Sequence, residues 1–178
     1  MLRAVPANRR RRRPDAPPAD RLTHVDEKGA TRMVDVSGKD KTHRRAVARG
    51  GVKLKPKTLR AVLDGEAPKG AVLETARLAG IQAAKRTWEL IPLCHPIPLT
   101  SVTIDLVPKG RNRIEITAEA VAADRTGVEM EALVAVTTAA LTIYDMLKAI
   151  ERGIVIEETV LLAKEGGRSG RWERGAAR

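Results

Sequence analysis

The stretch VTIDLVPKGRNRIEITA (102–118) decides the fold class, because two alternating segments flank a turn signal. Lys109-Gly110 marks the turn, and apolar residues on both sides of it recur at every second position. That period is typical of half-buried strands, so the stretch predicts an antiparallel hairpin. The apolar positions are Val102, Ile104 and Leu106 before the turn, and Ile114, Ile116 and Ala118 after it.

Helical patterns lie on both sides of the hairpin. Spacings of three and four between apolar or small residues predict helices over 70–86 and 127–150. Strands are predicted over 45–55 and 154–163, with a further strand over 30–36. The order strand, helix, strand, strand, helix, strand is that of the ferredoxin-like βαββαβ plan. We therefore predict an α+β fold with an antiparallel sheet, helices covering one face, and additional N-terminal strands.

Three connecting segments carry proline or glycine signals. A short helix is predicted to begin at Pro56 and to end before Gly65. The segment ELIPLCHPIPL (89–99) has three prolines in eleven residues and should be extended and irregular. The loop GGRSG (166–170) lacks the P-loop pattern and is predicted to end the last strand, although it could also cradle a phosphate.

The helix predicted over 127–150 is apolar on nearly every face between Ala132 and Ile143. A helix of this kind must be covered on more than one side. One side can be covered by the sheet, and we expect another subunit to cover the other.

Charge is concentrated near the ends of the chain. The 33 Lys and Arg residues exceed the 22 Asp and Glu residues, which gives a net charge of +11. Residues 1–21 hold seven Arg and two Asp, and residues 165–178 hold four Arg and two Glu. The Arg run and the four prolines of the N-terminal segment favour disorder. We expect a disordered basic tail over 1–21, one ferredoxin-like domain over 22–170 and a flexible tail over 171–178.

Composition excludes several classes of protein. The single cysteine, Cys94, rules out an intrachain disulfide and favours a reducing compartment, which we take to be the cytoplasm. Two Trp and one Tyr are too few for a nucleic-acid platform of stacked rings. The charge-free run from Ala132 to Tyr144 is too short for a bilayer, which needs about 20 apolar residues. The histidines and Cys94 lack metal-ligand spacing, so no metal site is predicted.

Several charged side chains have two interpretations that spacing leaves open. Lys69, at a helix start, is either an ordinary exposed lysine or a phosphate contact, since helix N-termini favour anions. Lys85 ends the same helix, where a cation also suits the helix dipole. Asp145 and Lys148 form either a surface ion pair or a partly buried pair that supports acid–base work. His95, between prolines, is either structural or ligand-binding.

Glu129 and Glu131 open the long helix, where acidic residues complement the helix dipole. Glu131 and Asp145 are fourteen positions apart, which is roughly 21 Å along a continuous helix. Both ends of one helix could hardly line one compact pocket. A site that uses both ends is therefore either long or assembled from two subunits, and the apolar circumference of the helix favours two subunits.

Longer motifs carry a specific resemblance. AGIQAAKRT (79–87), LIPLCHP (90–96) and TGVEMEAL (126–133) resemble the MoaC family of cyclic pyranopterin monophosphate synthases, which act in molybdenum-cofactor biosynthesis. The resemblance extends over about residues 22–170. It implies a lyase that converts (8S)-3′,8-cyclo-7,8-dihydroguanosine 5′-triphosphate to cyclic pyranopterin monophosphate and releases diphosphate. It also implies a homohexamer, a trimer of dimers, with active sites at subunit interfaces.

The resemblance also assigns site residues. Catalytic roles fall on Asp145 and Lys148 of YDMLK (144–148), and on Lys69 of the KG motif. The implied substrate-binding positions are Leu93, Cys94, His95, Met130, Glu131, Glu129, Lys85 and Arg44. Arg44, in THRRA (42–46), matches a basic position expected to meet the triphosphate.

The implied chemistry rests on clustered cations. Lysines close together should depress one another's pKa and so provide acid–base capacity near neutrality, while the cations neutralise the departing diphosphate. No cofactor is expected, apart from Mg²⁺ that can accompany the triphosphate. The chain departs from the family pattern at Ala71, Leu147 and Arg168, and none of these removes a proposed catalytic group.

Two other classes of protein stay open. One is a nucleic-acid-binding module of the same fold, which the scarcity of aromatic residues opposes. The other is a non-catalytic nucleotide-binding protein, which a turnover assay would distinguish from an enzyme.

Overall fold

The computed structural model describes His24 and residues 28–175. The chain divides into two compact units, Met1–Val34 and Asp35–Arg178. Every helix and strand of the described residues belongs to the second unit. The predicted basic tail, residues 1–21, lies outside the described residues.

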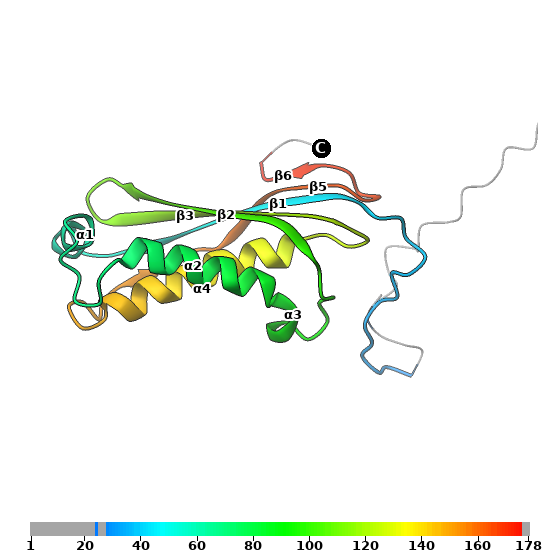
Figure 1. Cartoon of the computed structure of the whole chain (residues 1–178), viewed down its shortest axis with the longest axis horizontal. Helices are drawn as coiled ribbons and strands as arrows, with labels where there is room; N and C mark the ends of the chain where they lie inside the picture. The colour runs from blue at the N-terminus through cyan, green and yellow to red at the C-terminus, as the bar shows by residue number, and fades with distance from the viewer. Residues whose placement is uncertain (1–23, 25–27, 176–178) are drawn as a thin grey trace, which may run out of the picture. The chain divides into compact units, whose positions relative to one another are not determined.

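The order of elements follows the predicted hairpin and helices (Figure 1). The strands are β1 (Thr42–Lys53), β2 (Leu99–Lys109), β3 (Arg113–Asp124), β4 (Val155–Ile156), β5 (Val160–Glu165) and β6 (Trp172–Glu173). The helices are α1 (Pro56–Leu63), α2 (Val72–Lys85), α3 (Thr87–Leu90) and α4 (Glu129–Leu147). The hairpin, the two long helices and the short helix at Pro56 are confirmed, with boundaries moved by a few residues.

The six strands form one sheet with antiparallel pairing throughout. The order is β2–β3–β1–β5–β6, and β4 pairs with β1 beside this path. Without the two-residue strands, this is the strand order of the ferredoxin-like plan. Figure 1 shows α2 and α4 side by side on one face of the sheet, where they contact each other and the strands. The predicted α+β fold is therefore confirmed.

The prediction of a strand over 30–36 is wrong. Only Thr31 forms an isolated bridge in that segment, and residues 32–36 have no regular structure. Met33 is 51% exposed, so the alternating pattern does not bury an apolar side there. Additional N-terminal strands are thus not found among the described residues.

The C-terminal part of the sheet is more divided than predicted. The strand expected over 154–163 is split into β4 and β5 by residues 157–159, which have no regular structure, and Glu157 there forms an ion pair with Arg113 of β3 at 2.5 Å. The GGRSG loop does end β5, but β6 follows it and pairs with β5. The sheet therefore extends past the predicted domain boundary at residue 170.

The core lies between the sheet and the pair formed by α2 and α4. Alternate residues of β1 and β3 are fully buried, as the period of two requires. Gly80 of α2 lies so close to α4 that a Cβ atom there would be 2.7 Å from the carbonyl oxygen of Ala135. The small residues of α2 therefore allow the close packing that their spacing predicted.

Helix α4 is buried on the side that faces the sheet and α2. Among the described residues it is the single helix whose length and apolar composition would suffice to cross a membrane. Half of that span is buried within the protein. Leu141 on its outer side is 54% exposed, so this chain alone does not cover the whole apolar circumference.

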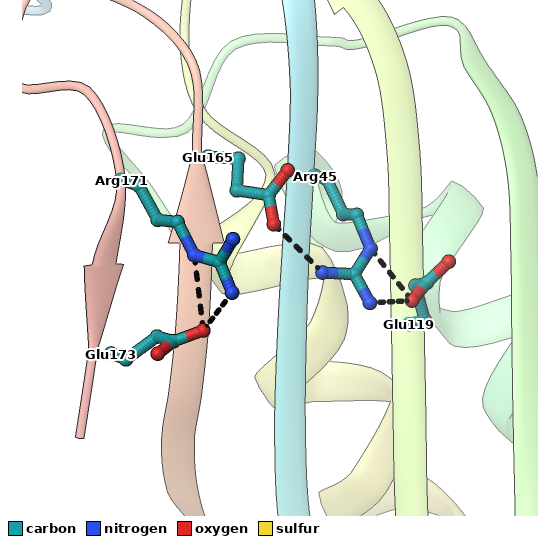
Figure 2. A network of polar contacts seen from close by, with 5 residues as sticks. All are labelled: Arg45, Glu119, Glu165, Arg171 and Glu173. Atoms are coloured by element: carbon teal, nitrogen blue, oxygen red, sulfur yellow. Dashed lines mark hydrogen bonds and ion pairs between the residues drawn. The ribbon is translucent and has the colours of Figure 1, made fainter. Parts of the chain in front are cut away.

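The face of the sheet opposite the helices carries ion pairs. Arg45 of β1 donates from Nε to Glu119 of β3 at 2.8 Å and from Nη1 to Glu165 of β5 at 3.1 Å (Figure 2). Arg171 forms an ion pair with Glu173 at the neighbouring edge. Arg45 thus links three adjacent strands, although partly exposed pairs of this kind contribute only about 0–1 kcal/mol each.

Candidate active site

The loop before α2 brings a lysine to the far end of α4. Gly70 adopts a φ of +83°, and its N–H donates to the carbonyl of buried Ala67 at 2.9 Å. This turn sets the position of Lys69, whose Nζ lies 2.6 Å from Oδ2 of Asp145 in the last turn of α4. A glycine is required at this turn because other residues rarely adopt a positive φ.

Asp145 also holds Lys148, whose Nζ lies 2.7 Å from Oδ1. We call Lys69, Asp145 and Lys148 the lysine half-site. Hydrogen bonds from Lys148 and then Lys69 lower the pKa of Asp145 to about 2, so the carboxylate is ionised at neutral pH. The side chains of all three are about half exposed, which leaves the ammonium groups accessible to an anion.

The expected depression of lysine pKa values is not found for Lys148. The hydrogen bond from its ammonium group to Asp145 raises the pKa of Lys148. The hydrogen bond and the charge of Asp145 outweigh the opposing effect of desolvation on this pKa. In this chain Asp145 therefore keeps Lys148 charged and fixes its direction.

A second cluster lies at the start of α4. Glu131 is 3% exposed, and its Oε2 has no hydrogen-bond partner among the described residues. Burial, with a smaller contribution from the charge of Glu129, raises the pKa of Glu131 to about 7. Cys94 lies near enough for the charge of Glu131 to raise the thiol pKa, in addition to the larger effect of burial. At pH 7 the Glu131 carboxyl is therefore present in both protonation states, and the Cys94 thiol is held in its neutral form.

We call Glu129, Met130, Glu131, Leu93 and Cys94 the glutamate half-site. The three residues of α4 occupy its first turn, and Leu93 and Cys94 are half-buried in the irregular segment after α3. Glu129 is further held by Lys164 of β5, with Nζ and Oε1 3.5 Å apart. Sequence reasoning missed Lys164, because only the pairing of β5 with β1 brings it to α4.

The other predicted site residues have different surroundings. His95 is half-buried, and its charge contributes to the low pKa of Asp35, after the larger effect of hydrogen bonds from Ser37. Lys85 is exposed at the end of α2, and this end of α2 lies on the same side as the start of α4 (Figure 1). Arg44 is half-buried and donates to backbone carbonyl groups.

The two half-sites lie at opposite ends of one unbroken helix. α4 is continuous from Glu129 to Leu147, so Glu131 and Asp145 are separated by roughly 21 Å of helix. The structure thus brings the three catalytic candidates together and groups most substrate-binding candidates elsewhere. Among the described residues, no group of three or more His, Cys, Asp or Glu side chains could hold a metal ion.

The buried carboxyl of Glu131 predicts a pH effect on stability. Its pKa is about 7 in the folded chain against 4.5 when unperturbed, so the folded state binds more protons between these values. The free energy of unfolding should therefore fall as pH rises from 5 to 8. Glu131→Gln stays neutral and should be more stable than wild type at pH 8 by up to about 3 kcal/mol.

Denaturant unfolding from pH 5 to pH 8 measures this difference. Glu158→Gln, at an exposed position, is the matched control and should follow the wild-type curve. Parallel curves for wild type and Glu131→Gln would show that the carboxyl does not titrate in this range.

Comparison with known proteins gives a family and close relatives. The MoaC family matches residues 33–167. The chain is 59% identical over 154 residues to the cyclic pyranopterin monophosphate synthase of Thermomicrobium roseum, covering 86% of this chain and 93% of that protein. It is 57% identical over 153 residues to cyclic pyranopterin monophosphate synthase 3 of Mycobacterium tuberculosis, covering 86% of each. The synthase of Novosphingobium aromaticivorans is 56% identical over 154 residues, covering 85% of this chain and 96% of that protein.

Proposed function

The chain belongs to the MoaC family, and from this premise we propose that it catalyses the formation of cyclic pyranopterin monophosphate in molybdenum-cofactor biosynthesis. The substrate is the GTP-derived cyclic nucleotide triphosphate, and the second product is diphosphate. The reaction makes the protein a lyase. The observation that carries the proposal is the lysine half-site, where one ionised carboxylate holds two accessible ammonium groups.

The lysine half-site suits an anionic reaction centre. Lys69 and Lys148 together with Asp145 carry a net charge of +1, so a phosphate group that approaches meets an excess of positive charge. Asp145 fixes both ammonium groups in direction before the substrate binds, which removes the cost of orienting them during the reaction. We propose that these lysines neutralise charge that develops as the diphosphate departs, and that one of them transfers a proton.

The glutamate half-site suits recognition of the purine-derived ring. Glu131 has a pKa of about 7, so its carboxyl exists in both protonation states near neutral pH. It can donate a hydrogen bond when protonated and accept one when ionised, and its Oε2 has no partner among the described residues. We propose that Glu131, with Met130, Leu93, Cys94 and His95, binds the ring, and that Lys85 contacts the phosphates.

The function test is release of diphosphate from the cyclic GTP-derived substrate by the purified full chain. Turnover linked to formation of the pyranopterin product is expected. Substrate binding without release of diphosphate would instead indicate the non-catalytic nucleotide-binding class. Binding of nucleic acid without either property would favour the nucleic-acid module.

We further propose a homo-oligomer, a hexamer built as a trimer of dimers, in which each site takes one half-site from each of two chains. The separation of the half-sites along α4 supports this, because roughly 21 Å exceeds the reach of one compact pocket. The exposed Leu78 of α2 and Leu141 of α4 offer apolar surface to a partner. Light scattering should give a mass several times 19.3 kDa, and a stable monomer would contradict the proposal.

The proposal also covers metal dependence and cellular location. Mg²⁺, if required, enters with the substrate triphosphate and not through a resident site. The cytoplasm is the location that the single cysteine favours.

A further inference from the structure

Arg44 points to the face of the sheet that carries the helices. It pairs with Ala122 across β1 and β3, in the same register as the buried Ala46 and Ala120. Its neighbour Arg45 points to the opposite face, where it joins the ion-pair network of Figure 2. The two adjacent arginines therefore have separate roles, and Arg44 faces the side on which the candidate site is built.

Two backbone carbonyl groups accept hydrogen bonds from the guanidinium group of Arg44. Its Nε donates to the carbonyl oxygen of Asp124 at 3.0 Å, and its Nη2 donates to that of Arg125 at 3.1 Å. Asp124 is the last residue of β3, and Arg125 begins the turn that leads to α4. The turn is also held from another direction, since Arg125 donates from Nε to the carbonyl oxygen of Lys39 at 2.9 Å.

This turn leads directly into the glutamate half-site. Only residues 126–128 separate Arg125 from Glu129, where α4 begins. A displacement of the turn would therefore move Glu129 and Glu131 together with the first turn of the helix.

The third nitrogen of the Arg44 guanidinium, Nη1, lies beside the loop after β5. Gly166 and Gly167 have φ values of +101° and +71°, which other residues rarely adopt. A Cβ atom on Gly167 would collide with Nη1 of Arg44, and one on Gly166 would collide with the carbonyl oxygen of His43. The two glycines thus allow the loop to close over the guanidinium group.

Lys164 connects the 166–170 loop to the start of α4. Its Nζ donates to Oγ of Ser169 at 2.6 Å and lies 3.5 Å from Oε1 of Glu129. Arg44 and Lys164 therefore join β1, the start of α4 and the 166–170 loop at one point.

We propose that Arg44 is a positioning residue that holds the first turn of α4 and the 166–170 loop in place. The proposal rests on the proposed function and adds a structural role to the phosphate contact that the family resemblance suggested for this residue. Two of its five N–H groups donate to backbone carbonyl oxygens, and Nη1 lies beside Gly167 of the loop.

Steady-state kinetics separate the two roles. Arg44→Lys keeps the charge but cannot reproduce the forked donation to two carbonyls. If Arg44 positions the glutamate half-site, Arg44→Lys and Arg44→Ala should both lower kcat/KM by about tenfold or more, and to a similar extent. Arg49→Ala removes another half-buried arginine of β1 and is the matched control, which should resemble wild type. A large loss of kcat/KM in Arg44→Ala that Arg44→Lys rescues would overturn the proposal.

Hydrogen exchange tests the same contact without turnover. In Arg44→Lys, amides of residues 132–135, whose acceptors are the carbonyls of the first turn of α4, should exchange about tenfold faster than in wild type and in Arg49→Ala, while the β2–β3 amides keep their protection. Unchanged protection at 132–135 would overturn the proposal even if the chain proved inactive on the expected substrate. A lack of wild-type turnover, with faster exchange in the variant, would refute only the proposed function.

A double-mutant cycle tests the link to the loop. Gly167→Ala should lower kcat/KM in the wild-type background, because its methyl group displaces the Arg44 guanidinium and its positive φ strains the loop. In the Arg44→Ala background the same substitution should have a clearly smaller effect on kcat/KM, since only the backbone strain is left. Additive effects on kcat/KM would show that the loop and Arg44 act separately.

Discussion

Asp145→Ala is expected to lower turnover by about 10³-fold or more without loss of the fold. The carboxylate holds Nζ of Lys69 at 2.6 Å and Nζ of Lys148 at 2.7 Å, so its removal releases both ammonium groups at once. The Asp145 side chain is 54% exposed, and its loss leaves no cavity in the core. Diphosphate release measures turnover, and thermal unfolding measures stability.

Two further variants identify what Asp145 supplies. Asp145→Asn keeps the shape of the side chain but loses the charge that holds the lysines, and it should be nearly as inactive. Asp105→Ala removes an exposed aspartate from β2, on the far face of the sheet, and should keep full activity. Turnover of Asp145→Ala near the wild-type value would show that the lysines do not need this carboxylate.

Mixing Lys148→Ala chains with Glu131→Ala chains is expected to restore turnover that neither variant has alone. If each site joins the lysine half-site of one chain to the glutamate half-site of another, a mixed pair contains one intact site. Random exchange between equal amounts of the two variants should make about a quarter of all sites intact. Diphosphate release after subunit exchange measures the recovery.

The matched control mixes two variants whose substitutions lie in the same half-site. Lys69 and Lys148 contact the same carboxylate within one chain, so mixing Lys69→Ala with Lys148→Ala chains should restore nothing. Native mass spectrometry of the two mixtures confirms that chains have exchanged. Equal recovery in both mixtures, or none in either after complete exchange, would rule out the two-chain site.

Local patterns were sufficient for the elements that form the core. The hairpin around Gly110 and the helices α2 and α4 each have an apolar period that only one secondary structure satisfies. The pattern failed over 30–36, because alternation predicts a strand only where a neighbouring strand is available for pairing. β6 was missed because a two-residue strand has no period, and its pairing with β5 depends on the turn before it.

Some contacts within the site could be predicted from the sequence, and others could not. The spacing of Asp145 and Lys148 placed both on one face of a helix, and the ion pair at 2.7 Å agrees with that. The contact of Lys69 with Asp145 joins residues 76 positions apart, and only the family resemblance suggested a common role.

Glu131 and Lys148 were harder to anticipate. Glu131 was attributed to the helix dipole, but its burial depends on how α4 lies on the sheet, which the sequence of one helix does not contain. Clustering of lysines was visible in the motifs, but the position of the Asp145 carboxylate between Lys69 and Lys148, which raises the pKa of Lys148, was not.

The unbroken α4 has a genetic consequence in the proposed assembly. The two ends of each α4 belong to two different sites. A chain with substitutions at both ends therefore inactivates every site to which it contributes. In a cell that makes intact chains and Lys148→Ala, Glu131→Ala double-variant chains equally, about a quarter of the sites would keep both intact halves. One half would survive if each site lay within a single chain. The allele with both substitutions would therefore reduce the number of intact sites below one half, and in that sense it would be dominant.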